Sequence, residues 1–265
     1  MESAIYPITE KEHNSSIVKK KKDAQGSFKQ EMANQRRRER YIIRLINTNF
    51  DWRAYHIVLT YDDNHLPLDN AQAERDYNKW LRNVRIRCRA KGVREPKALD
   101  FLEWQEVDEE NGVKAVRYHH HVIIDCGLPM GDLALLWNEG GRGLGALANF
   151  DDEETLKRAM SCALGVVNTG HLKLDKQSVE GLAKYVLKYQ NRKHAWKRTR
   201  NLQEPQTPRP NDGKFTRAKV AKAAKLHVDD AAYWEKLYAG YTFSECVAKY
   251  NDFTGWSLLV KMYKS

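Results

Sequence analysis

Apolar and polar residues alternate along this chain with two different periods. A period of two residues, typical of a half-buried strand, occurs in segments 52–61, 99–107 and 117–124. Spacings of three and four residues, typical of an amphipathic helix, occur in segments 41–46, 71–91, 151–165 and 179–189. Strands that alternate with helices and include one clear hairpin predict an α+β fold. We expect a central antiparallel sheet flanked by helices that pack mostly on one face.

The hairpin joins the second and third of these strands. The residues between them, 108–112, are polar and end with Asn111-Gly112, a dipeptide that favours a tight turn. A hairpin places its two strands side by side, so both strands can contribute side chains to one site.

Three consecutive histidines lie in the third strand. Because side chains alternate between the faces of a strand, His119 and His121 share a face, roughly 7 Å apart along the strand. That separation allows two imidazoles to hold one metal ion. His120 points to the opposite face with Tyr118 and Val122, which are expected in the core. The simpler alternative is a histidine-rich strand that binds no ion.

The second strand can supply a third ligand to this metal site. Glu103 and Gln105 share one face of that strand, and Glu106 lies on the other. We predict Glu103 as the oxygen ligand, with Gln105 as the second choice. Glu106 replaces them if the pairing shifts by one residue, because such a shift moves every side chain to the other face. Mixed nitrogen and oxygen ligands suit Mn²⁺, whereas Mg²⁺ prefers oxygen but is abundant.

The helix predicted at 179–189 carries the second group of chemical interest. Tyr185 and Tyr189 are four residues apart and lie on one face, beside a stripe formed by Lys184 and Lys188. Taken alone, the pattern favours an amphipathic helix with two tyrosines half in the core. A two-histidine metal site elsewhere in the chain weakens this interpretation.

The charge and composition indicate a polyanionic partner and a reducing compartment. The chain of 265 residues has a formal net charge of +10 and an isoelectric point near 9.3, which favours a polyanionic partner over a membrane. The four cysteines form no C-x-x-C pair, so neither a disulfide framework nor a zinc ribbon is expected. No apolar run reaches the ~18 residues of a membrane span, and a cytoplasmic location is expected.

Composition also divides the chain into three regions. Residues 1–40 are polar and basic, and they predict a flexible arm that grips phosphates. Residues 41–204 hold the strands, the histidines and the tyrosines. A proline-rich linker then opens a small accessory unit over 205–265, whose role the pattern does not indicate.

These motifs, in this order, resemble the HUH endonucleases, and specifically the rolling-circle replication initiators of phages and plasmids. The three matching segments are 58–61, 118–123 and 182–189, and the resemblance covers about residues 50–205. It implies a five-stranded sheet with the metal site on its open face. His120 departs from the pattern, because most members carry a bulky apolar residue there.

The resemblance also implies a reaction. A divalent ion held by His119, His121 and Glu103 would polarise a phosphodiester of single-stranded DNA. Tyr185, with the Lys188 ammonium favouring its phenolate, would attack and leave a 5′-phosphotyrosine and a free 3′-OH. Tyr189 would make the second cut that ends a replication round, or would be structural. An origin hairpin, a host helicase and a host polymerase are the expected partners.

Three other functions stay open at this point. The chain could be a nickase of the relaxase or transposase type, although relaxases carry the tyrosine before the histidines. It could be a non-catalytic, basic DNA-binding protein with a structural metal. It could also be a zinc hydrolase that uses the three histidines, which leaves the tyrosine helix unexplained.

Overall fold

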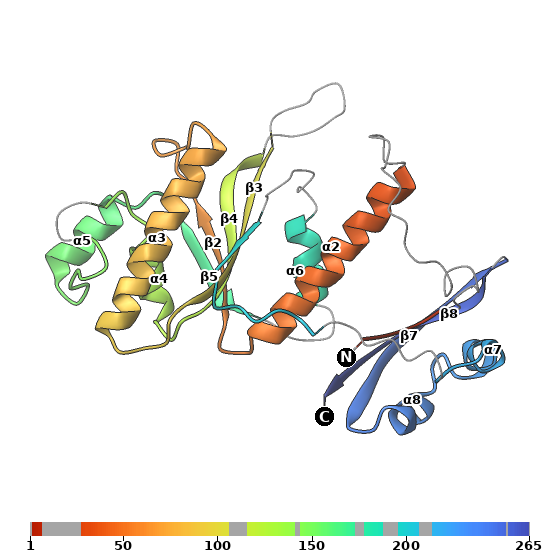
Figure 1. Cartoon of the computed structure of the whole chain (residues 1–265). Helices are drawn as coiled ribbons and strands as arrows, with labels where there is room; N and C mark the ends of the chain where they lie inside the picture. Colours follow the sequence, from red (N-terminus) through yellow and green to blue (C-terminus); the bar gives the residue numbers. More distant parts are fainter. Residues whose placement is uncertain are drawn as a thin grey trace. The chain divides into compact units, whose positions relative to one another are not determined.

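The computed structural model describes residues 2–6, 28–105, 116–140, 144–172, 178–187, 196–206, 214–252 and 254–264. The chain forms two compact units (Figure 1). One comprises residues 27–206, and the other combines residues 1–26 with residues 207–265. The first unit carries the histidines and the tyrosine helix.

A five-stranded antiparallel sheet lies at the centre of the first unit. In spatial order β5-β2-β4-β3-β6, its strands are β5 (Val167–His171), β2 (Tyr55–Thr60), β4 (Val116–Asp125), β3 (Lys97–Gln105) and β6 (Trp196–Arg198). This sheet confirms the predicted α+β architecture. The antiparallel pairing of β3 with β4 is also as predicted, while the expected turn at 108–112 lies outside the described residues.

Two helices, α3 (Asn70–Ala90) and α4 (Met130–Leu135), cover one face of the sheet, and α5 (Glu153–Ser161) packs against α4. Asp69 caps α3, since its side chain accepts a hydrogen bond from the backbone N–H of Gln72. The buried side of α3 includes Tyr77 and Trp80, and it packs on Val122, Ile124 and other apolar residues of the sheet. The sequence pattern of this helix therefore explains its position.

Two further helices, α2 (Phe28–Asn49) and α6 (Ser178–Leu187), pack on the opposite face. Figure 1 shows α3 and α4 on one side of the sheet and α2 and α6 on the other. Ile42 and Ile46 of α2 and Ala183 of α6 form a second core with Phe101 and Ile123. The expectation that helices pack mostly on one face is wrong, because the apolar residues of the second face also require cover.

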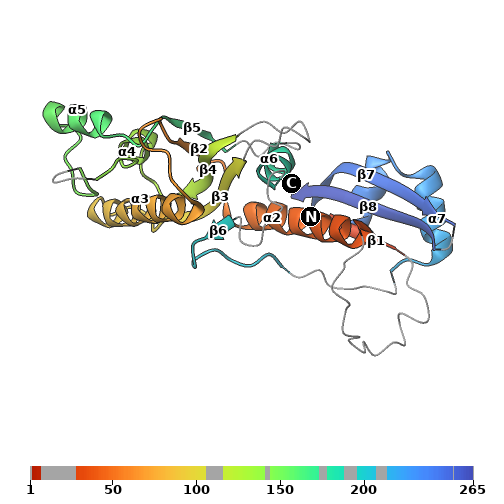
Figure 2. The same cartoon turned by 90° about the horizontal axis from the view of Figure 1, so that it is seen from above.

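The smaller unit is a three-stranded sheet with two helices (Figure 2). Its elements are β1 (Glu2–Ile5), α7 (Arg217–Leu226), α8 (Ala231–Leu237), β7 (Tyr241–Asn251) and β8 (Gly255–Lys264). The sheet order is β1-β8-β7, and Trp234 and Val260 are completely buried between sheet and helices.

The two ends of the predicted N-terminal arm are therefore structured. Residues 2–5 pair with β8, and residues 28–40 belong to α2. Residues 7–27, which include four consecutive lysines (Lys19 to Lys22), lie outside the described residues. Among the described helices, none combines the length and the apolar content that crossing a bilayer requires.

Candidate metal centre

Glu103, His119 and His121 come together on the face of the sheet that carries α6. The pairing of β3 with β4 sets Glu103 directly opposite His119 and Phe101 opposite His121. Oε2 of Glu103 lies 3.1 Å from Nε2 of His119 and 2.9 Å from Nε2 of His121. One ligand atom from each residue falls within 4.8 Å of the other two, so the cluster can hold a metal ion.

The cluster has a strongly anionic member. Burial alone raises the pKa of Glu103, but hydrogen bonds from His119 and His121 outweigh it and lower the pKa to about 2. Burial lowers the pKa of His119, but the contact with Glu103 and a hydrogen bond to the Arg117 carbonyl raise it overall. A positive charge is thus stabilised at this point, and a metal ion would supply it in place of a proton.

Nδ1 of each metal-site histidine contacts another group, so Nε2 is the nitrogen that can bind a metal. Nδ1 of His119 donates to the carbonyl oxygen of Arg117 at 2.7 Å. Nδ1 of His121 lies 3.3 Å from Nε2 of His56, and the two rings stack with 5.5 Å between centroids. Such partners fix the orientation and tautomer of metal-binding histidines.

His56 is a residue of the site that the sequence analysis did not identify. It lies on β2 and is half-buried. Burial, followed by the charge on His121, lowers the pKa of His56 to about 4, so its ring is neutral near pH 7. No local signal in the sequence identified His56, because it meets His121 only through the pairing of β2 with β4, in which Val58 lies opposite His121.

Tyr185 is the part of the tyrosine helix that reaches this centre. Val179 and Ala183 bury one side of α6 in the second core. Tyr185, on another side of α6, is 48% exposed, and its ring meets His121 edge-on with 5.2 Å between centroids. Lys188 and Tyr189 lie outside the described residues, as does Glu106, and the side chain of Gln105 is not described.

His120 points to the opposite face, as predicted, and is nearly completely buried. Nδ1 of His120 lies 3.0 Å from Oδ1 of Asp100, and its Nε2 lies 3.4 Å from the hydroxyl of Tyr61. The ring stacks on Tyr77 with 5.3 Å between centroids. This network explains how the fold accommodates a histidine at a position where most HUH endonucleases, which the sequence resembles, carry an apolar residue.

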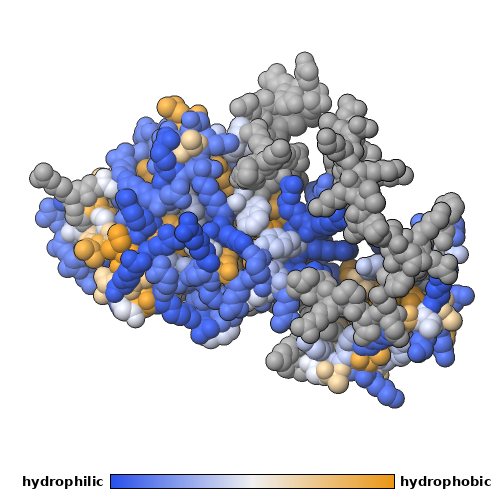
Figure 3. Space-filling model, viewed as in Figure 1, coloured by the Kyte–Doolittle hydropathy of each residue, from blue (hydrophilic) through white to orange (hydrophobic). Residues whose placement is uncertain are grey.

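A basic groove of about 640 Å³ runs between α3 and the segment that contains β6. Its lining includes the cationic residues Arg85, Arg89, Lys197, Arg198 and Arg200. Glu95 is the acidic residue among the described lining residues, and it lies 3.6 Å from both Arg85 and Arg89. The surface over α3 is mainly hydrophilic (Figure 3). Lys197 and Arg198 also pair with Glu74 and Glu204, so the groove keeps only a modest excess of positive charge, of the sign that suits a phosphate backbone.

Comparison with protein-family models, with curated proteins and with solved structures finds no match. The candidate function therefore depends on the geometry of the metal centre and of Tyr185.

Proposed function

We propose that this protein is a metal-dependent endonuclease and strand transferase that nicks single-stranded DNA through Tyr185. The observation that carries the proposal is the contact between Tyr185 and His121, because it joins a nucleophile to a candidate metal centre. The resemblance to rolling-circle initiators supports a role in starting DNA replication at an origin.

The candidate metal centre suits phosphoryl transfer. Glu103, His119 and His121 would hold a divalent ion, which would supply positive charge to the scissile phosphate. Two imidazoles and one carboxylate suit Mn²⁺ better than Mg²⁺, which prefers oxygen ligands. His56 holds the His121 ring in place, and the Arg117 carbonyl does the same for His119.

Tyr185 performs the attack in this proposal. Its phenol oxygen bonds to phosphorus while the bond from phosphorus to the 3′-oxygen breaks. The phenol proton passes to solvent, and the leaving 3′-oxygen takes a proton from solvent. The products are a 5′-phosphotyrosine and a free 3′-OH, so the bond energy is kept for rejoining. The exposure of nearly half of Tyr185 leaves room for a DNA strand to approach.

Lys188 and Tyr189 complete the proposal through the resemblance alone. The Lys188 ammonium would favour the phenolate of Tyr185, and Tyr189 would cut the returning origin. The basic groove and the net charge of +10 support DNA as the partner. A host helicase and a host polymerase would act with the nickase.

One experiment tests this function. The protein is incubated with Mn²⁺ and a single-stranded DNA library of random sequence that is labelled at the 3′ end, because the 5′-phosphotyrosine retains the 3′ fragment. We expect a labelled band at the mass of the protein plus DNA on a denaturing gel. The band should disappear with EDTA and in Tyr185→Phe, and Tyr189→Phe serves as the matched variant. A full-yield adduct in Tyr185→Phe would refute the assignment.

A non-catalytic DNA-binding protein with a structural metal is the second candidate. Glu103 and His121 are each only 4% exposed, and such burial is typical of structural sites. Under this alternative the protein binds DNA with or without the metal and forms no adduct, so the same gel distinguishes the two.

A further inference from the structure

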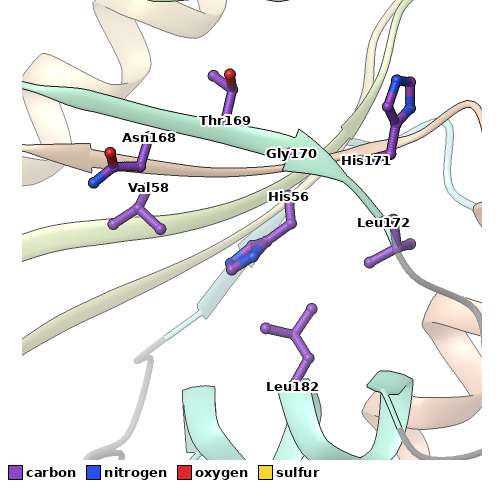
Figure 4. Close-up of a pocket in the computed structure, with 8 residues that line it drawn as sticks. All are labelled: His56, Val58, Asn168, Thr169, Gly170, His171, Leu172 and Leu182. Carbon is purple, nitrogen blue, oxygen red and sulfur yellow. The ribbon is translucent and has the colours of Figure 1, made fainter.

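A pocket of about 400 Å³ lies on the same face of the sheet as the metal ligands. In Figure 4, Asn168, Val58, His56 and Leu172 project from one side of the sheet, and Leu182 of α6 faces them. Thr169 and His171 point to the other side. Val58 is paired with both His121 and Asn168, so the pocket begins one strand away from a metal ligand.

Gly170 gives the pocket a flat floor. It pairs with His56, so any side chain at this position would share the face of His56. A Cβ built on Gly170 meets no atom within 4 Å, which means that open space lies above the backbone. A planar group can therefore rest against the strand at this point.

The chemistry of the walls favours a neutral, planar ligand. Val58, Leu172 and Leu182 are aliphatic, and no lysine or arginine occurs among the described residues that line the pocket. Among these described residues a phosphate would therefore find no lysine or arginine to pair with. The Asn168 amide offers both a donor and an acceptor, which is what reading the edge of a base requires.

We propose that this pocket binds one nucleobase of the single-stranded DNA, close in the strand to the phosphate at the metal centre. The inference rests on the proposed function for its ligand. The pocket lies one to two strand spacings, roughly 5–10 Å, from β4. A base in this pocket would fix which phosphate reaches Tyr185, so the pocket would contribute to the choice of cleavage position.

Gly170→Leu tests the pocket, because its Cβ meets no atom within 4 Å and the added side chain occupies the open space. Thr169→Leu is the matched control, since Thr169 is exposed and points away from the pocket. Both changes are made in Tyr185→Phe, so that binding is measured without covalent chemistry. The ligand is the oligonucleotide most enriched by binding from a random single-stranded library, and Mn²⁺ is present throughout.

Fluorescence anisotropy is measured with this oligonucleotide and with derivatives that lack one base at a time. With Gly170 intact, the loss of one particular base should weaken binding by about tenfold. Gly170→Leu should weaken binding of the intact strand by a similar factor and should no longer respond to the missing base. Thr169→Leu should behave as the parent does.

Three results would overturn the inference. If the protein binds and cleaves single strands but Gly170→Leu binds them as tightly as Thr169→Leu does, the assignment of the pocket to a base is wrong. The proposed nickase function then stands. If no strand is bound at all, both proposals fail. A mononucleotide that displaces the strand at equal concentration would instead assign the pocket to a free nucleotide and overturn the inference.

Discussion

The ring of Tyr185 lies edge-on to the ring of His121, with 5.2 Å between their centroids and 89° between their planes. This contact joins two segments that the sequence separates widely, a metal-binding strand and an amphipathic helix. A nucleophile beside a cation site can attack a phosphate held at that site. The predictions below test the parts of this arrangement one at a time.

Removing a metal ligand should abolish tight Mn²⁺ binding. We expect His119→Ala, His121→Ala and Glu103→Ala each to weaken Mn²⁺ by at least about a hundredfold, because each supplies a ligand atom of the same cluster. Isothermal titration calorimetry measures the affinity. His65→Asn is the control, since His65 pairs with Asp62 and Glu139 and is not part of the cluster. Equal losses in the control and in the ligand variants would contradict the assignment.

His56 should raise the affinity for the metal by orienting His121, without binding the metal itself. His56→Phe keeps a flat ring against His121 but removes the nitrogen at 3.3 Å. We expect Mn²⁺ affinity to fall by about 10- to 100-fold, a smaller loss than that caused by His121→Ala. The same calorimetric titration tests this order, and an unchanged affinity would show that His56 does not orient His121.

Metal affinity should fall as the pH falls, with His119 as the cause. Its pKa is raised above the ordinary 6.5, and the metal requires its neutral ring, so protons compete with Mn²⁺ as the pH drops through that raised pKa. Glu103 adds no slope above pH 5, because its pKa is about 2. In the metal-free protein, the protonated ring of His119 stabilises the fold. This contribution to the free energy of unfolding is lost as the pH rises through the raised pKa of His119. Affinity that is constant from pH 8 to pH 6 would contradict this.

The buried network around His120 should stabilise the fold without affecting the metal. His120→Leu would remove the contacts of His120 with Asp100 and with Tyr61, and we expect a loss of about 3 kcal/mol in the free energy of unfolding. The double variant with Asp100→Leu should recover part of that loss. Urea denaturation gives the stability, and Mn²⁺ affinity should change by less than about threefold. A large loss of affinity in the folded variant would assign His120 to the metal site.

The basic groove should contribute affinity for DNA that depends on salt and not on sequence. Arg85→Gln and Arg89→Gln each remove one positive charge from it. We expect each to reduce the slope of log K against log salt concentration by about one. Lys225→Gln, in α7 of the smaller unit, is a charge-matched control. Unchanged slopes would show that the groove does not contact phosphates.

The sequence predicted the elements whose signals are local. The spacing of Tyr77, Trp80 and Val84 predicted α3, and the alternation of β3 and β4 predicted which of their side chains share a face. Because these strands are close in sequence, Glu103 could be matched to His119 and His121 before the fold was known.

The parts that escaped prediction depend on distant pairings. His56 and His121 are 65 residues apart, and nothing in a period of two residues indicates that β2 lies beside β4. β1 has only four residues, too few for a periodic signal, and its partner β8 lies at the other end of the chain. The position of α2 over the second face likewise follows from tertiary packing.

Peptide mapping of the covalent adduct tests the central claim most directly. Trypsin cleaves after Lys184, Lys188 and Arg192, so Tyr185 and Tyr189 fall in separate peptides, 185–188 and 189–192. After reaction with Mn²⁺ and single-stranded DNA, nuclease and trypsin digestion should leave a nucleotide on peptide 185–188, and EDTA should abolish it. A nucleotide found only on another peptide, or none at all under conditions in which Mn²⁺ and DNA are both bound, would contradict the account.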